Sequence, residues 1–247
     1  LMLRDLLDFP QPLRVALYFA VVVLCLGILS SPLSFYQGYV LPRRFGLSLQ
    51  GLKGWLVDTA KGVTLGLLLG MAAMVLVYWL LGSFPQVWWL LSALFLILFT
   101  VVMTHLAPIV IVPLFYRLQP LADSDLSERL LRLAQRAGTR VQGVFTMELS
   151  SKATVGNAAL MGLGNTRRIV LGDTMLKGYS AEEIEVIMAH ELGHHVQRHI
   201  AKLIAFQSVV ALLGFYVGHL ALSSAVYRLG FYGLSDVAAF PLLALAL

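Results

Sequence analysis

The pentapeptide His190-Glu191-Leu192-Gly193-His194 decides how the rest of this 247-residue sequence is interpreted. Residues four apart lie on one face of an α-helix, so the imidazoles of His190 and His194 converge on one point. Two neutral imidazoles are good ligands for Zn²⁺, and Glu191 stands where a general base is needed to take a proton from water. The stretch therefore predicts a helix that binds one zinc ion through His190 and His194, with Glu191 as the catalytic residue.

The segment around this motif predicts a small domain of mixed helices and strands. Ser180 and Glu183 form a capping box, so the motif helix is expected to begin just after Ser180. No proline follows until Pro241, which would let this helix continue into the apolar stretch beyond it. The other elements expected here are a helix over 123–137 and strands over 141–147, 157–162 and 168–172.

The composition is that of an integral membrane protein. Hydrophobic residues make up 59% of the chain and charged residues 13%, whereas about 25% charged residues is usual in soluble domains. Long apolar stretches predict membrane-spanning helices over about 13–30, 63–82, 87–112 and 200–222, and the start of another from about 237. We therefore expect transmembrane regions at 1–116 and 200–247, separated by a protease domain at 117–199.

Basic residues predict the orientation of the chain in the membrane. Arg43, Arg44, Lys53 and Lys61 fall between the first two spans, and ten of the 18 Lys and Arg residues fall within 117–199. The spans place both segments on one side, and basic loops are typical of the cytoplasmic side. We expect a multi-pass membrane protein with a cytoplasmic active site. The net charge of +5 forms no basic patch, so no nucleic-acid partner is expected.

The turn between the second and third spans is flanked by tryptophans. Trp79, Trp88 and Trp89 lie on either side of Gly82-Ser83-Phe84-Pro85, which predicts an aromatic belt at the membrane interface. Cys25 is the single cysteine, which excludes a disulfide within this sequence and a metal site built from several cysteines.

The other histidines are expected to stay outside the metal site. His195 points about 100° away from the second ligand around the helix, and His199 is expected on the side opposite His190. His105 and His219 lie within predicted spans. For these two residues a functional role and a hydrogen bond to a neighbouring helix are equally open.

A catalytic zinc site normally has three protein ligands, and this sequence shows two. Asp236 is the one acidic residue after His194, but the predicted spans place it at the far membrane face, so we do not expect it to bind the metal. The sequence stops at Leu247 within an apolar run. We therefore expect a fragment of a longer protein whose third ligand, a glutamate, lies beyond residue 247.

Several further segments resemble the integral-membrane zinc metalloproteases typified by the type I CAAX prenyl protease. The resemblance runs from about residue 30 to residue 200. The segments that carry it are Phe35-Tyr36-Gln37-Gly38-Tyr39 through Arg44-Phe45-Gly46-Leu47-Ser48 with Trp55 and Asp58, Ala107-Pro108 through Phe115 with Pro120-Leu121, Ser150-Ser151-Lys152, Asn157-Ala158 with Gly162, and Arg168 through Thr174.

This resemblance implies a mainly α, polytopic fold, in which a transmembrane helical barrel encloses a chamber and a small zincin-like α+β domain holds the zinc at the cytoplasmic end. It also implies a glutamate as third zinc ligand, well downstream of the histidine pair. The strand near Asn157 is expected beside the cleft, where an extended peptide could add to it. A role of Asn157 as a turn or strand-end residue is the equal alternative.

The activity implied by the resemblance is that of a membrane-embedded zinc metalloendopeptidase. Its partners would be the lipid bilayer and a membrane-associated or C-terminal peptide or protein substrate, lipidated or not. One alternative is an intramembrane site-2-type zinc protease, against which the charged approach Glu182-Glu183-Ile184-Glu185 argues. The other is a non-catalytic membrane scaffold that keeps a relic motif, and the two visible ligands leave it open.

Overall fold

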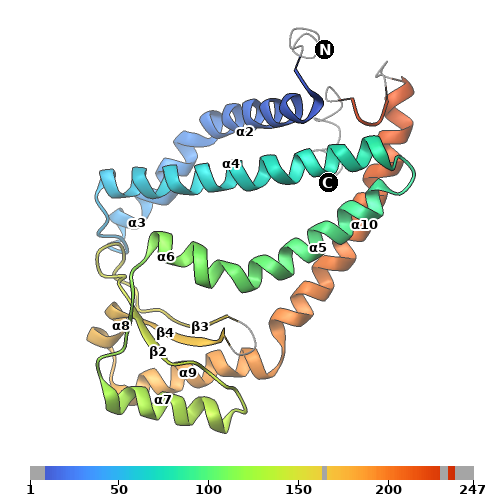
Figure 1. The fold of residues 1–247 in the computed structure, drawn as a ribbon. Helices are drawn as coiled ribbons and strands as arrows, with labels where there is room; N and C mark the ends of the chain where they lie inside the picture. Colours follow the sequence, from blue (N-terminus) through green and yellow to red (C-terminus); the bar gives the residue numbers. More distant parts are fainter. Residues whose placement is uncertain (1–8, 163–165, 229–232, 237–247) are drawn as a thin grey trace. The chain divides into compact units, whose positions relative to one another are not determined.

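The computed structural model describes residues 9–162, 166–228 and 233–236 (Figure 1). The chain divides into two compact units. The first, which we call the helical unit, comprises the described parts of Leu1–Ser34, Val57–Phe99 and Ala205–Leu247. The second, which we call the sheet unit, comprises the described parts of Phe35–Leu56 and Thr100–Ile204.

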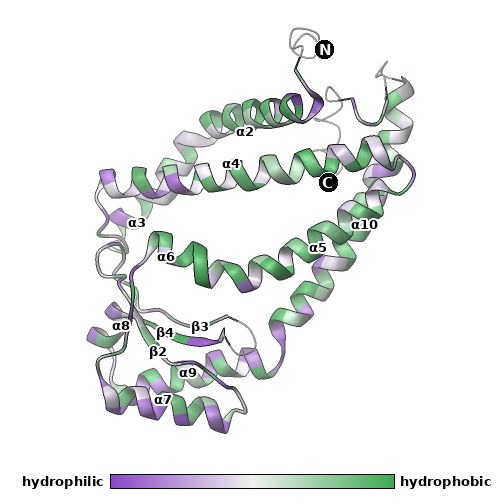
Figure 2. Cartoon of the chain, viewed as in Figure 1, coloured by the Kyte–Doolittle hydropathy of each residue, from purple (hydrophilic) through white to green (hydrophobic). Residues whose placement is uncertain are grey.

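Four helical stretches in the described ranges are long and apolar enough to cross a membrane. They are Gln11–Arg44, Leu52–Ser83, Trp88–Phe115 and His199–Val226. Figure 2 shows hydrophobic residues along most of their length, whereas α7 and α9 carry many hydrophilic residues. The prediction of a mainly helical, polytopic membrane protein is confirmed. The span expected from about 237 lies outside the described residues.

Two of these stretches are built from successive helical segments. The first joins α2 (Gln11–Phe35), the π-helix η1 (Tyr36–Val40) and α3 (Leu41–Arg44). The third joins α5 (Trp88–Leu106), the π-helix η2 (Ala107–Ile111) and α6 (Val112–Phe115). Pro108 in η2 has no N–H to close an α-helical turn, which accounts for the wider turn there. The second and fourth stretches are α4 (Leu52–Ser83) and α10 (His199–Arg228).

The helices extend beyond the spans predicted from apolar stretches. Helix α4 begins at Leu52 rather than near residue 63, and it includes Lys53 and Lys61. Of the segment 31–62 between the first two predicted spans, residues 45–51 lie outside a helix. Charged residues end an apolar stretch but not a helix, because an α-helix satisfies its own backbone hydrogen bonds in water as well as in lipid.

Trp88 lies in the hydrophobic core of the helical unit. Its side chain is fully buried among residues that include Tyr78 and Phe215. The indole Nε1 donates a hydrogen bond to Nδ1 of His219, 3.0 Å away. The prediction that Trp88 belongs to an interfacial belt is therefore wrong, because its N–H has a partner inside the unit. His219 takes the second of its two open roles, a hydrogen bond to a neighbouring helix, and Trp79 is 57% exposed.

The sheet unit contains a four-stranded sheet in the order β1-β2-β4-β3. The strands are β1 (Leu118–Pro120), β2 (Val144–Met147), β3 (Ala158–Met161) and β4 (Arg168–Gly172). Strands β2 and β4 are parallel, and the two outer pairs are antiparallel. Three of these strands were predicted, although β2 begins at Val144 rather than at 141. Strand β1 was missed, because three residues that include a proline carry little strand signal.

Helices α7 (Ser124–Arg136) and α9 (Ala181–Val196) pack on one face of this sheet, and the short helix α8 (Asp173–Gly178) follows β4 (Figure 1). Their shared core contains Leu130 of α7, Ile169 of β4 and Met188 of α9. Arg129 of α7 ties the two helices together, with Nε 2.5 Å from Glu185 Oε1 and a terminal nitrogen 3.2 Å from Glu182 Oε1. Helix α9 is therefore held against α7 both by the shared apolar core and by these ion pairs.

Candidate functional site

Helix α9 positions the His-Glu-x-x-His motif through its cap and its buried face. Ser180 Oγ accepts a hydrogen bond from the Glu183 N–H, and the Ser180 N–H donates to Glu183 Oε2 at 2.8 Å, which confirms the capping box. Ile184, Met188 and Leu192, spaced four residues apart, are buried against the sheet and α7. The histidines of the motif lie on another face of α9 and are exposed.

The two histidines meet as the spacing predicts. Nε2 of His190 lies 3.1 Å from Nε2 of His194, and the ring planes are perpendicular. Zn–N bonds of about 2.0–2.1 Å would let one ion reach both nitrogens, so the pair fits a zinc site. Glu191 and His194 line one cavity of about 450 Å³ with Leu160 of β3. The three motif residues are thus brought to one place.

Helix α9 ends at Val196 and α10 begins at His199, so the prediction of one continuous helix is wrong. Arg198 has φ 55°, in the left-handed region, which ends one helix and redirects the chain before the next. No glycine or proline marks this break, and the sequence therefore gave no local warning of it. The break turns His199 back toward the motif, and its Nδ1 lies 2.7 Å from Nδ1 of His194.

The helical spacing had predicted His199 on the far side of the motif helix. This prediction is wrong, because His199 lies next to His194. It also lines the 450 Å³ cavity. A histidine that binds metal through one ring nitrogen usually needs a hydrogen-bond partner at the other, and His199 stands at that position for His194. The sequence analysis missed this residue because it assumed that the helix was unbroken.

Two other histidines have different surroundings. His195 lines the same cavity as His194 and also a second cavity beside it. Burial lowers the pKa of His195, and the charge of Arg167 lowers it further. His105 Nδ1 lies 2.8 Å from the carbonyl oxygen of Val101, so its ring is bonded within its own helix.

No further ligand joins the histidine pair within the described residues, where no group of three or more His, Cys, Asp or Glu side chains is placed to share a metal. Asp236, which we did not expect to be a ligand, is buried in the helical unit, whereas the pair belongs to the sheet unit. The third ligand, expected beyond residue 247, stays a prediction.

Strand β3 lies beside the motif helix, at one end of the sheet order. Its residue Leu160 faces the cavity that Glu191 lines. Asn157, just before this strand, is exposed, and its carbonyl oxygen accepts a hydrogen bond from the Gly172 N–H at 2.7 Å. The backbone of Asn157 therefore has the strand-end role that was one of its two expected roles.

Asp173 organises the loop that leads to β3, and the sequence analysis gave it no role. Its carboxylate accepts hydrogen bonds from the N–H groups of Leu149 at 2.7 Å and Ser150 at 2.8 Å, and from the Ser150 hydroxyl. Burial opposes the charge of Asp173, but these hydrogen bonds outweigh it and lower the pKa of the carboxyl. Lys152 of this loop donates to the carbonyl oxygen of Phe115 at 2.7 Å.

These features define a membrane-spanning protein whose α+β part presents a His-Glu-x-x-His helix at a cavity. Residues 8–117 match the family described as CAAX prenyl protease N-terminal, five membrane helices. Residues 120–246 match peptidase family M48. The chain belongs to peptidase family M48, which confirms the resemblance found in the sequence. Membership of this family implies a metal cofactor.

Relatives from fungi and bacteria share this similarity. CAAX prenyl protease 1 of Saccharomyces cerevisiae is 31% identical over 213 residues, which cover 82% of this chain and 46% of the relative. The uncharacterized metalloprotease YhfN of Bacillus subtilis is 31% identical over 214 residues, which cover 84% and 50%. The crystal structure of S. mikatae Ste24p matches with a TM-score of 0.79 and 28% identity, over 85% of this chain and 50% of that one. The chain spans about half the length of these relatives.

Proposed function

We propose that the protein is a membrane-embedded, zinc-dependent metalloendopeptidase. The observation that carries this proposal is the 3.1 Å approach of the Nε2 atoms of His190 and His194, beside a cavity that Glu191 lines. Membership of peptidase family M48 supports it. The same membership disfavours the relic scaffold and the intramembrane site-2-type protease.

In this proposal Nε2 of His190, Nε2 of His194 and a glutamate that stays a prediction would hold one Zn²⁺. The ion supplies Lewis acidity at the scissile carbonyl when it is bound. Glu191 takes a proton from the attacking water and passes it to the leaving amine. His199 fixes the ring of His194 so that its Nε2 keeps facing His190.

The substrate backbone would pair with β3. In the described part of the sheet this strand is paired on one side, by β4, so its other edge can accept an extended peptide. Leu160 of β3 and Glu191 line the same cavity, which would bring a paired peptide to the base. Asn157 is exposed at the start of this strand and is proposed to contact the peptide.

The proposed substrates are membrane-associated or C-terminal peptides, lipidated or not. Relatives from S. cerevisiae and Arabidopsis thaliana are named CAAX prenyl protease 1 or its homolog, which supports this substrate class. Residues 117–199 would form the protease domain, between transmembrane regions at 1–116 and 200–247. The basic residues of 117–199 support a cytoplasmic active site.

Peptide cleavage by the natural protein in detergent tests this function. The substrates are a farnesylated CAAX peptide and its unmodified twin, each with and without a zinc chelator. We expect chelation to abolish cleavage and Glu191→Gln to lower kcat/KM by about 10²–10⁴-fold with zinc content unchanged. Glu128→Gln, which alters an exposed ion pair with Arg132, is the matched control and should cleave normally. Equal cleavage by Glu191→Gln and wild type would refute the proposed mechanism.

A further inference from the structure

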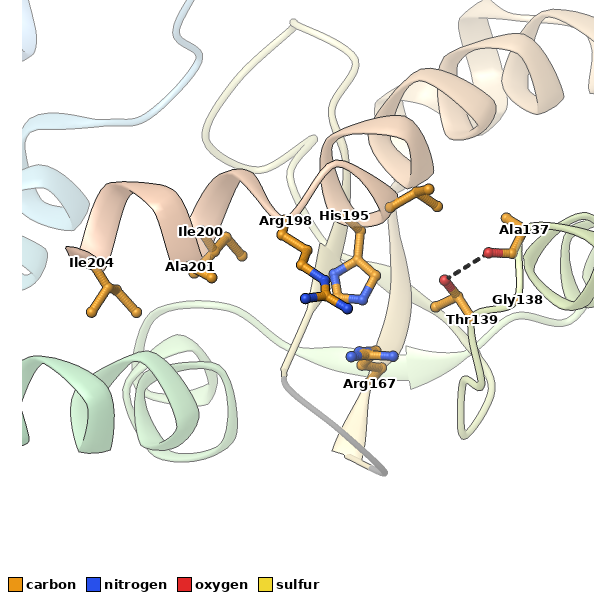
Figure 3. A pocket seen from close by; sticks show the side chains of 10 residues that line it. Ala137, Gly138, Thr139, Arg167, His195, Arg198, Ile200, Ala201 and Ile204 are labelled. Atoms are coloured by element: carbon orange, nitrogen blue, oxygen red, sulfur yellow. Dashed lines mark hydrogen bonds between the residues drawn. The ribbon is translucent and has the colours of Figure 1, made fainter. Parts of the chain in front are cut away.

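A second cavity, of about 470 Å³, lies in the sheet unit beside the first one. It is lined by Arg167 just before β4, by His195 and Arg198 around the helix break, and by Ile200, Ala201 and Ile204 of α10. Figure 3 shows Arg198 and His195 projecting toward Arg167. Residues far apart in the sequence thus bring two guanidinium groups to one hollow.

The charge of this cavity has one sign. Both arginines carry a positive charge, and of the described residues that line the cavity none is acidic. In the described part of the chain, Nε of Arg167 is buried without a hydrogen-bond partner. Buried polar groups in native proteins are almost always bonded, so this N–H marks the place of an acceptor that the described residues do not supply.

The N-terminus of α10 lies at the same place. The first N–H groups of an α-helix have no acceptor within the helix and carry the positive end of its dipole. Ile200 and Ala201, in the first turn of α10, line the cavity. Helix N-termini of this kind bind phosphate groups in many proteins, and here the N-terminus is joined by two arginines.

Arg198 occupies the cavity at a cost in backbone strain. Its φ of 55° is a conformation that glycine or asparagine adopts more easily than arginine. The side chain is exposed, so packing does not explain why arginine stands here. The left-handed backbone ends α9, but the fold does not require an arginine at this position, and this residue directs a cation into the cavity.

We propose that this cavity binds the phosphate group of an anionic phospholipid. Guanidinium groups match phosphate oxygens in geometry and charge. The membrane-spanning stretch that includes α10 begins at His199, directly after Arg198, which places the cavity at the end of a span, where lipid headgroups lie. The apolar side chains of Ile200 and Ile204 continue along the span from the basic end of the cavity. The proposal does not depend on peptidase activity.

Lipid retention by the natural protein in detergent tests the proposal, with native mass spectrometry as the readout. The probes are phosphatidylglycerol and phosphatidylcholine at equal concentration and ionic strength. The variants are Arg198→Asn, which removes the charge and tolerates the left-handed backbone, Arg167→Gln, and their combination. Arg132→Gln, at an exposed arginine of α7 that does not line the cavity, is the matched control.

We expect wild type to retain phosphatidylglycerol in preference to phosphatidylcholine. Arg198→Asn with Arg167→Gln should lower this affinity about tenfold to thirtyfold, while Arg132→Gln leaves it unchanged. Arg198→Asn alone should lower it about fivefold, and because Arg198 is exposed this variant keeps the test valid if Arg167→Gln fails to fold. Equal affinities in Arg198→Asn and Arg132→Gln would overturn the proposal.

A second arm separates the lipid from a free ion. Inorganic phosphate is added to delipidated protein, with chloride at equal ionic strength as the reference, and the Tm is measured. The lipid proposal expects a Tm rise with phosphatidylglycerol that is lost in Arg198→Asn, and a smaller rise with millimolar phosphate. A rise with phosphate that matches or exceeds the rise with the lipid would assign the cavity to a soluble phosphate and overturn the lipid part.

Discussion

Nδ1 of His199 lies 2.7 Å from Nδ1 of His194, although the two residues belong to different helices. The break at Gln197 and Arg198 makes this approach possible, since an unbroken helix would carry His199 away from His194. His194 then has one nitrogen toward His190 and the other toward α10. The ring of a proposed ligand is held from both sides before any metal binds.

This relationship predicts that His199 tunes the affinity for zinc. His199→Ala should weaken zinc binding by about 10–100-fold, because the ring of His194 loses the partner that orients it. Competition with a fluorescent chelator measures the affinity without a peptidase assay. His105→Ala is the matched control, since His105 bonds within its own helix. Unchanged zinc affinity in His199→Ala would show that the contact has no part in the metal site.

The proposed ligand His194 can be tested by metal content. His194→Ala should reduce the bound zinc from about one ion per chain to well below half, because two protein ligands cannot hold the ion tightly. Elemental analysis after gel filtration measures the ratio. His219→Ala also removes a histidine, but one whose partner is Trp88, and it should keep its zinc. Full zinc content in His194→Ala would remove this residue from the site.

Arg129 should matter more for stability than another arginine of the same helix. Arg129→Ala leaves Glu185 and Glu182 without their shared partner and loosens the motif helix from α7. Arg132 pairs with Glu128 on the open surface, where ion pairs contribute little. Thermal unfolding in detergent should therefore show a clear loss of Tm in Arg129→Ala and almost none in Arg132→Ala. Equal losses would mean that the cross-helix pair adds nothing.

Asp173 predicts a specific dependence of stability on pH. Its pKa is lowered in the folded chain, so its contribution is complete above the unfolded-state pKa of about 3.9 and is lost as the pH falls through the lower folded pKa. At pH 7, Asp173→Asn should cost on the order of 2 kcal/mol through its lost hydrogen bonds. The difference from wild type should shrink below about pH 4. Glu148→Gln, at an exposed neighbouring acid, controls for the change in net charge. A difference that stays constant as the pH falls below about 4 would contradict this account.

Gly162 is the position after β3 where a side chain cannot be accommodated. Its φ is 87°, and an added Cβ would lie 2.6 Å from the carbonyl oxygen of Thr166. Gly162→Ala should destabilise the chain by more than about 1 kcal/mol and disturb the pairing of β3 with β4. Gly178→Ala meets open space at the end of α8 and should be neutral or slightly stabilising. Chemical denaturation of both variants would show the contrast, and equal stability would refute it.

The sequence predicted the elements whose signals are local. Helix α7 was expected over 123–137 and runs over Ser124–Arg136, because its N-cap Asp123, its apolar face and the following glycine all lie within a few residues. The capping box at Ser180 was found for the same reason. The convergence of His190 and His194 depends on helical spacing alone, and it was therefore predictable as well.

Features that depend on distant residues escaped prediction. The burial of Trp88 arises from packing against α10, and no local pattern distinguishes it from the exposed Trp79. The helix break carries arginine where glycine is usual, so the return of His199 to the motif left no sequence signal. Arg167 and Arg198 meet at one cavity only because the fold brings β4 and the start of α10 together.

Because β3 lies at the edge of the sheet, the local folding of a substrate would decide whether it can bind before its side chains matter. A segment can join this strand only when its own backbone groups are free, so a peptide already engaged in a helix or a sheet could not enter. Tails and loosened segments would be cut, and the same sequence within a folded partner would survive. The discriminating property would then be the local folding of the target near its cleavage point, with side-chain identity a secondary filter.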